Sequence, residues 1–280
     1  MTDPLVSTEW LAGRLGRSDV RILDASWWMP AEGRSGHAEY LQCHIPGAIF
    51  FDIDAIADHS TDLPHMLPTP EAFALAVGRL GLGRDATIVT YDSFGIRASA
   101  RVWWALRVMG FAKVFVLDGG LKAWSAEGRA VASGEVMVDP TVLSVTQDRG
   151  LVRDATEVGE IIASGSAQLV DARGGARFRG ETPEPRAGLR SGHMPGAKNV
   201  PFDSLLNADG RMKTATELSA IFEAAKVDLA LPIVTTCGSG VTASVVALAL
   251  ARLGRDRTPV YDGSWTEWGG LRDTPVVTGS

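Results

Sequence analysis

The sequence predicts an α/β protein built from two similar halves, each with a mostly parallel central sheet flanked by helices on both faces. Short runs of apolar and β-branched residues alternate with helical patterns along the chain. This alternation is typical of parallel sheets covered by helices. The order of motifs in the first part of the chain also returns in the second part. We therefore expect a duplicated α/β unit.

In the first half, Ser7 is placed to cap a first helix, because a serine hydroxyl accepts a hydrogen bond from a free amide of the first turn. The glycine of the Pro46-Gly47 pair favours a turn, after which the chain returns as a strand. Apolar runs predict buried strands over 20–25, 86–91 and 113–117, and helical patterns predict helices over 71–80, 99–109 and from Gly119 onward.

The second half repeats these motifs in the same order and at a nearly constant separation. The strand ending at Asp24 matches the one ending at Asp171, and the motif His-Ile-Pro-Gly-Ala at His44 matches His-Met-Pro-Gly-Ala at His193. Likewise, Leu-Asp-Gly-Gly-Leu-Lys-Ala-Trp matches Tyr-Asp-Gly-Ser-Trp-Thr-Glu-Trp. We expect one domain over 1–135, a linker over 136–150 that carries glycine and proline, and a second domain over 151–280.

Composition limits the function classes. The chain has 280 residues, of which 45% are hydrophobic and 21% charged, as in globular proteins with a sizeable core. Its net charge of −6 argues against nucleic acid or an anionic membrane as the main partner. The N-terminus lacks a basic region followed by an apolar segment, so we expect a cytoplasmic protein. Two cysteines exclude a disulfide framework.

The stretch with the clearest chemistry surrounds Cys237. A strand is predicted over 233–236, then a loop containing Gly238 and Gly240, then a helix over 245–253. A cysteine between a strand and a helix start is surrounded by backbone N–H groups, which favour the thiolate. The alternative is a buried structural cysteine, but the glycine-rich loop favours a reactive thiol.

Aligning the two halves without gaps places Asp92 opposite Cys237. The first half lacks the thiol nucleophile at this place. We therefore expect the first half to be an inactive scaffold.

Together, the motifs resemble those of the two-domain rhodanese-like sulfurtransferases over essentially the whole chain. The matching stretches include DASWW, HIPGA, FFDID, RFRGETPEPR, SGHMPGAKNVPF and YDGSWTEWGG, and the loop CGSGVTAS resembles the 3-mercaptopyruvate branch. In the thiosulfate branch, the two positions after the cysteine are typically basic. Here they are Gly238 and Ser239. The resemblance implies two tandem rhodanese-like domains and no cofactor.

The resemblance implies transfer of sulfur from 3-mercaptopyruvate, through a persulfide on Cys237, to cyanide or to a dithiol such as thioredoxin, with release of pyruvate. Arg177 and Arg186 would hold the substrate carboxylate and keto oxygen, although Arg179 and Arg190 are close enough to be confused with them. The loop amides would stabilise the anionic outer sulfur; they belong to Gly238, Gly240, Val241 and Thr242.

The resemblance also implies a proton relay of Ser239, His65 and Asp54. In such a relay, a carboxylate orients an imidazole, and the imidazole serves a hydroxyl at the reacting centre. Because His65 and Asp54 precede the repeat that contains Ser239, the sequence does not show that the three meet. The alternative for His65 is an ordinary loop histidine.

Three other functions stay open. Thiosulfate:cyanide sulfurtransferase activity is the nearest, and a non-catalytic persulfide carrier is the second. A phosphatase of the same fold would need an arginine six residues after the cysteine, where this chain has Ala243. We expect a monomer.

The remaining conspicuous residues have structural explanations. His44 and His193 occupy equivalent places in both halves, so they are expected to fix a turn, and the paired Asp24 and Asp171 are expected to do the same at strand ends. No cluster has metal-ligand spacing. Cys43 has no helix start behind it and is expected to be inert. Three tryptophans are expected in the core: Trp103, Trp104 and Trp265.

Overall fold

The computed structural model describes residues 3–279, which form two compact units. The first unit comprises 1–59, 67–148 and 206–212, and the second comprises 60–66, 149–205 and 213–280, apart from the terminal residues outside the described range. Each unit therefore includes one short segment, 206–212 or 60–66, that lies between stretches of the other unit in the sequence. The domain boundaries expected from the sequence stay a prediction.

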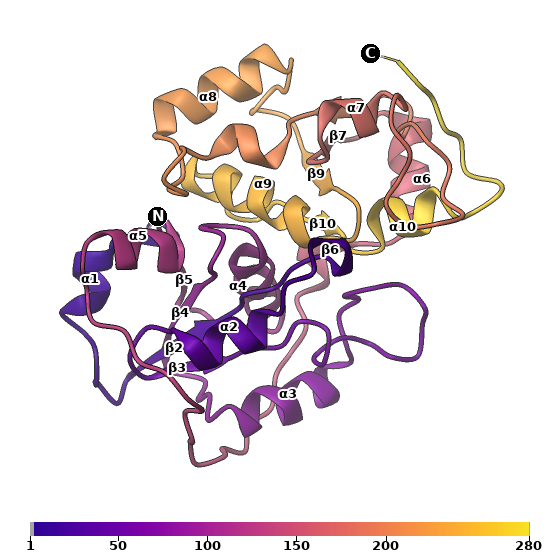
Figure 1. Cartoon of the computed structure of the whole chain (residues 1–280). Coiled ribbons are helices and arrows are strands. Elements are labelled where there is room, and N and C mark those ends of the chain that lie inside the picture. The colour runs from indigo at the N-terminus through magenta and orange to yellow at the C-terminus, as the bar shows by residue number, and fades with distance from the viewer. Residues whose placement is uncertain (1–2, 280) are drawn as a thin grey trace. The chain divides into compact units, whose positions relative to one another are not determined.

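Within the described residues, each unit contains one five-stranded parallel sheet, and helices flank both sheets (Figure 1). The strand order is β1-β5-β4-β2-β3 in the first unit and β6-β10-β9-β7-β8 in the second. The two orders are the same once the strands of each unit are counted from its start. The predicted α/β duplication is confirmed.

In the first unit, β1 and α2 were not predicted from the sequence, and the other strands and helices lie close to their predicted positions. Its strands are β1 (Leu5–Val6), β2 (Val20–Asp24), β3 (Ala48–Phe50), β4 (Thr87–Tyr91) and β5 (Val114–Leu117), and its helices are α1 (Thr8–Ala12), α2 (Gly36–Gln42), α3 (Pro70–Arg79), α4 (Ala98–Val108) and α5 (Gly120–Ala126), with a 3-10 turn at Pro30–Glu32. The predicted cap is confirmed, because the Ser7 hydroxyl accepts from the Trp10 amide.

The second unit repeats this arrangement. Its strands are β6 (Val152–Arg153), β7 (Gln168–Asp171), β8 (Lys198–Asn199), β9 (Ile233–Thr236) and β10 (Val260–Tyr261), and its helices are α6 (Ala155–Ser164), α7 (Gly175–Phe178), α8 (Ala215–Ala224), α9 (Val241–Arg252) and α10 (Ser264–Trp268), with 3-10 turns at Arg149–Leu151 and Phe202–Leu205. Helix α9 packs against β9 and β10, and nearly all its residues are buried.

The stretch 136–148, expected as a linker, is hydrogen-bonded within the first unit. The Thr141 amide donates to the Gly78 carbonyl at the end of α3, and its hydroxyl donates to the Leu82 carbonyl. The Asp148 amide donates to the Val108 carbonyl. These contacts fix the segment along two helix ends of that unit.

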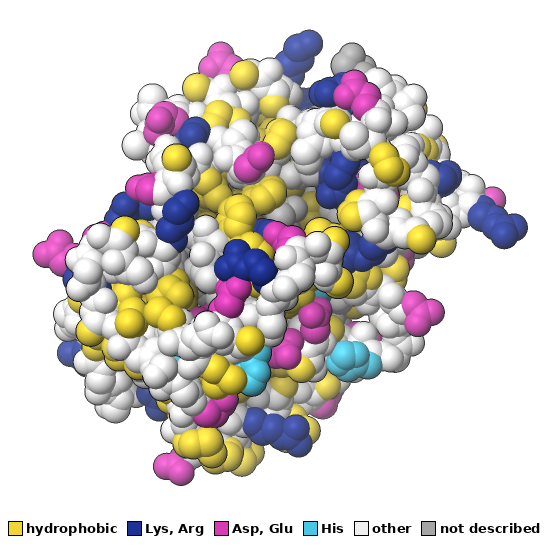
Figure 2. Space-filling model, in the orientation of Figure 1, with side chains coloured by type: hydrophobic (Ala, Val, Ile, Leu, Met, Phe, Trp, Pro, Cys, Tyr) yellow, Lys and Arg dark blue, Asp and Glu magenta, His cyan; other side chains and the backbone are white. Residues whose placement is uncertain are grey.

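Each unit has its own apolar core. In the first unit the core cluster includes Leu11, Val89 and Trp124, and in the second it includes Val158, Trp265 and Trp268. The predicted burial of Trp103, Trp104 and Trp265 is confirmed. On the face drawn in Figure 2, basic side chains are interspersed with acidic ones.

Candidate active site

The Cys237 loop joins the carboxyl end of β9 to the start of α9. Helix α9 begins at Val241, so the prediction that it begins at Val245 was wrong. The residues between are small or β-branched and suggested a loop, but Gly240, at φ 77°, makes the left-handed turn that lets the helix start there. The free amides of the first helical turn therefore follow Cys237 closely. Such amides favour an anion.

The Cys237 side chain is a free thiol and is buried, with 2% of its surface exposed. The start of α10 holds the carbonyl groups of its loop. The Trp265 amide donates to the Cys237 carbonyl over 2.9 Å, and the Thr266 amide and hydroxyl both donate to the Gly238 carbonyl over 2.9 and 2.6 Å. With these carbonyls engaged by α10, the loop is fixed in one conformation.

Arg177, on α7, reaches the residue that follows the cysteine. A β-carbon on Gly238 would stand 3.2 Å from Arg177 Nη2, a distance that leaves little space for a side chain there. The guanidinium group of Arg177 donates to Glu184 through Nη2 over 2.5 Å and through Nε over 3.2 Å. Arg177 is 29% exposed at its side chain, so its charge is partly accessible beside the loop.

Glu184 is the centre of a buried charge network. Its side chain is 2% exposed and pairs with both Arg177 and Arg173. Arg173, equally buried, also donates to both carboxylate oxygens of Asp171 at the end of β7. Burial alone would lower the pKa of Arg173, but the carboxylates of Asp171 and Glu184 outweigh it and raise that pKa above its ordinary value. Through Glu184, this network holds the guanidinium group of Arg177 in place.

The neighbouring arginines have different surroundings. Arg179 pairs with the exposed Glu181. Arg190 donates to carbonyl groups at the end of α10, among them those of Trp268 and Gly269. Arg186 is half-buried in the same unit. Arg177 thus stands beside the cysteine loop, next to Gly238.

The residues expected in the proton relay fall in different units. Ser239 lies in the cysteine loop and is buried, and His65 is grouped with the same, second unit although it precedes that unit in the sequence. His65 is also buried and has φ 61°, an uncommon conformation for a residue with a side chain. Asp54 belongs to the first unit, where its carboxylate accepts from the Trp27 indole over 2.8 Å. The relay stays a prediction.

The paired histidines and aspartates each contact a backbone group. His44 Nδ1 contacts the Tyr40 carbonyl and His193 Nδ1 contacts the Phe178 carbonyl, each over 2.8 Å. The carboxylate of Asp24 accepts from the Ser26 amide. Asp171 accepts from the Arg173 amide in the same way.

The loop of the first unit contains its own anion. The Asp92 carboxylate, aligned with Cys237, accepts hydrogen bonds of 2.8 to 3.0 Å from four backbone amides. These amides belong to Phe94, Gly95, Arg97 and Ser99. The aspartate thus fills the space that an anionic sulfur would need.

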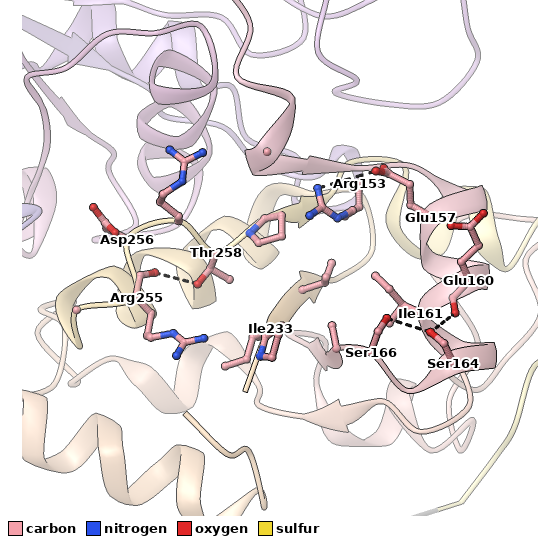
Figure 3. Close-up of a pocket in the computed structure, with 17 residues that line it drawn as sticks. Arg153, Glu157, Glu160, Ile161, Ser164, Ser166, Ile233, Arg255, Asp256 and Thr258 are labelled. Atoms are coloured by element: carbon pink, nitrogen blue, oxygen red, sulfur yellow. Dashed lines mark hydrogen bonds and ion pairs between the residues drawn. The ribbon is translucent and has the colours of Figure 1, made fainter. Parts of the chain in front are cut away.

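A cavity of about 880 Å³ lies in the second unit, at the other end of its sheet (Figure 3). It is lined by Arg153, Glu157, Ile233 and Arg255 among others. Ile233 begins β9, whereas Cys237 follows the last residue of that strand. This cavity is therefore separate from the candidate active site.

Among residues 3–279, no group of His, Cys, Asp and Glu side chains is arranged to hold a metal ion. No helix in the same range is long and apolar enough to cross a membrane.

Sequence reasoning missed two residues of the site, Glu184 and Ser264. Glu184 stands in the motif Pro-Glu-Pro-Arg, where a glutamate between prolines gave no sign of burial. Ser264 had a signal, because it occupies the place that Gly120 has in the half without a cysteine. The hydroxyl is present only where the nucleophile is.

The rhodanese-like domain family profile matches residues 7–127 and 154–271. The chain belongs to this family, with two tandem domains.

Similar proteins include two enzymes that differ in name. The chain is 43% identical to 3-mercaptopyruvate sulfurtransferase of Escherichia coli, over 97% of this chain and 96% of that protein. It is 44% identical to thiosulfate sulfurtransferase of Bos taurus, over 94% of this chain and 91% of that protein. Among solved structures, SseA of Escherichia coli, described as having the rhodanese fold, superposes with a TM-score of 0.87 at 42% identity, covering 94% of this chain and 99% of that one.

Proposed function

We propose that this chain is a 3-mercaptopyruvate sulfurtransferase that uses Cys237 as its nucleophile. The observation that carries the proposal is the 3.2 Å approach of Arg177 Nη2 to the β-carbon position of Gly238. The place beside the cysteine has no cation of its own, and a guanidinium from α7 stands over it. Such a site suits a donor whose charge lies on a carboxylate, away from the sulfur.

In the first step, the Cys237 thiolate attacks the sulfur of 3-mercaptopyruvate. A sulfur–sulfur bond forms and the carbon–sulfur bond breaks, with its electron pair passing to the enolate of pyruvate. A proton then returns to carbon and pyruvate leaves. Arg177 and Arg186 hold the carboxylate and keto oxygen during this step, which lowers the energy of the developing enolate.

The product is a persulfide on Cys237, whose outer sulfur is anionic. Backbone amides of the loop stabilise it, since a helix start favours negative charge. They include those of Gly238, Val241 and Thr242, whereas the amide of Gly240, expected from the sequence to take part, already donates to the Ser264 hydroxyl. In the second step, cyanide or a dithiol such as reduced thioredoxin attacks the outer sulfur, and the Cys237 thiolate is restored.

Ser239 and His65 manage the proton in the first step. Both are buried residues of the second unit, which supports a shared role. Asp54, from the first unit, is proposed as the carboxylate that orients His65. The monomeric state and a cytoplasmic location are likewise proposed. One relative from Arabidopsis thaliana, 43% identical, is named as mitochondrial.

Identity to relatives does not decide the donor, because the two relatives above match this chain almost equally and differ in the donor named. The choice rests on Gly238, Ser239 and the arginines. Turnover with a small donor would also exclude a persulfide carrier that only another enzyme can load.

The test compares Arg177→Ala with Arg179→Ala, a matched change two residues away. Removing a charge-assisted contact to the substrate should lower kcat/KM for 3-mercaptopyruvate by about tenfold or more in Arg177→Ala. Arg179→Ala should stay close to wild type, since Arg179 pairs with an exposed glutamate. Equal effects of the two substitutions would contradict the assignment of Arg177.

A further inference from the structure

Ser264 contacts the cysteine loop from the first residue of α10. Its side chain is fully buried. The hydroxyl oxygen accepts from the amide of Cys237 over 3.2 Å and from the amide of Gly240 over 3.1 Å, while the hydroxyl donates to the Tyr261 carbonyl over 2.8 Å. Because one donor and two acceptor positions are filled, the hydroxyl has one orientation. It connects the beginning and the end of the loop.

The backbone of Ser264 is strained. Its φ of 50° is in the left-handed region, which residues other than glycine, asparagine and aspartate rarely adopt. Strain of this kind persists where surrounding contacts require it. A serine kept here, where glycine would be unstrained, indicates that the hydroxyl is needed.

The first unit shows what happens without this hydroxyl. Its corresponding residue is Gly120, with φ 54°, and a β-carbon there would lie 2.3 Å from the Asp92 carbonyl oxygen and 2.6 Å from that of Gly95. No side chain fits. Its loop is held instead by the Asp92 carboxylate, which accepts from the amide of Gly95, the residue aligned with Gly240. The same amide is therefore engaged in both units by different groups.

We propose that Ser264 is a positioning residue that holds the Cys237 loop in its anion-binding conformation, in the role that the Asp92 carboxylate has in the first unit. The proposal rests on the proposed function of Cys237. An aspartate that binds the loop amides has no atom left to react. Giving that role to Ser264 leaves the sulfur of Cys237 unengaged by the loop's own structure and the remaining amides available to a charged sulfur.

The experiment uses the full-length chain with Cys43→Ser, so that Cys237 is the one thiol present. Ser264→Ala removes the hydroxyl and keeps a side chain in the strained conformation. Ser264→Gly removes the hydroxyl and the strain together, as in Gly120, so it should fold even if the alanine variant does not. Ser204→Ala is the control, because this hydroxyl donates to the Pro201 carbonyl in the same unit without contacting the loop.

The first readout is the rate of Cys237 alkylation by iodoacetamide as a function of pH. Both Ser264 variants should react about tenfold more slowly at pH 7, because the loop amides are no longer fixed toward the sulfur. The control should keep the wild-type profile. Wild-type profiles in both Ser264 variants would overturn the proposal.

The second readout separates this proposal from the proposed function. With 3-mercaptopyruvate and cyanide, the Ser264 variants should lose kcat about tenfold or more, while KM changes little because the arginines still hold the donor. If the wild-type protein did not turn over this donor, the proposed function would fail, but the alkylation profiles would still test Ser264. A rise in KM with unchanged kcat would contradict a role in positioning the nucleophile.

Discussion

At the residue scale, the carboxylate of Glu184 positions the guanidinium group of Arg177 by accepting two hydrogen bonds from it. Replacing Glu184 by Gln keeps the shape but leaves Arg177 and the buried Arg173 without this carboxylate. Breaking a buried ion pair on one side costs about 3–5 kcal/mol. We expect a lower free energy of unfolding and a KM for 3-mercaptopyruvate raised about tenfold, as the guanidinium loses its fixed position.

The control for Glu184→Gln is Glu181→Gln, a change in the same loop that affects an exposed pair with Arg179. Exposed pairs contribute little, so both KM and stability should be close to wild type. Denaturant unfolding and steady-state kinetics measure the two effects. Identical behaviour of the two variants would show that Glu184 does not position Arg177.

The buried carboxyl group of Asp24 should make the stability of the fold depend on pH. Burial raises the pKa of this carboxyl from 3.8 to about 6, and hydrogen bonds from Ser26 offset only part of that effect. The folded state thus favours the protonated form. Its stabilising contribution is present below the unfolded pKa and is lost as the pH rises from about 4 to about 6.

Asp24→Asn should therefore be more stable than wild type at pH 7, by up to about 3 kcal/mol, and this advantage should shrink on acidification to pH 4. The amide oxygen can still accept from the Ser26 amide. Urea unfolding of both proteins at several pH values measures the difference. A difference that does not vary with pH would mean that Asp24 is not the titrating group.

Candidate residues that stand in a distinctive motif could be predicted from the sequence, whereas the residues that hold them in position could not. Cys237 was evident from the glycine-rich loop, and the pairing of the two halves identified Asp92 as its counterpart. Glu184 and Ser264 act through contacts with residues distant in sequence or in an adjoining motif. Only the folded chain brings Ser264 to the amides of Cys237 and Gly240.

At the scale of elements, the two units share a strand–loop–helix segment, but the helix starts at a different aligned position in each. In the second unit the helix begins at Val241, whereas in the first it begins at Ala98, which is aligned with Ala243. Strands β2, β4, β5, β7 and β9 were predicted because buried apolar runs are distinctive, whereas the two-residue strands β1, β6, β8 and β10 were not. The start of α9 was not, since small residues after a cysteine are equally common in loops. The short α7, which carries Arg177, has too few residues to show a period.

The loop between β4 and α4 should depend on Asp92. Asp92→Ala leaves four backbone amides without their acceptor and should destabilise the first unit by about 3 kcal/mol. Hydrogen–deuterium exchange measures this locally. Peptides covering 92–99 should exchange faster, while peptides covering 237–244 serve as the internal reference. Unchanged protection over 92–99 would contradict the role given to this carboxylate.

At the scale of the whole molecule, the duplication could be predicted from the sequence because matching motifs recur in the same order. The strand orders of the two sheets agree with it. The sequence did not predict that segment 60–66 belongs to the second unit and segment 206–212 to the first, because this depends on tertiary contacts rather than on sequence pattern. The loop of the second unit carries Cys237, whereas the carboxylate of Asp92 fills the corresponding loop of the first unit.

The choice of sulfur donor is measured by kcat/KM for 3-mercaptopyruvate and for thiosulfate, side by side on the same protein with cyanide as acceptor. Because Gly238 and Ser239 place no cation beside the thiol, we expect a preference for 3-mercaptopyruvate of about a hundredfold or more. A preference for thiosulfate would contradict it, and would mean that Arg177 and the residues after Cys237 do not set the choice of donor.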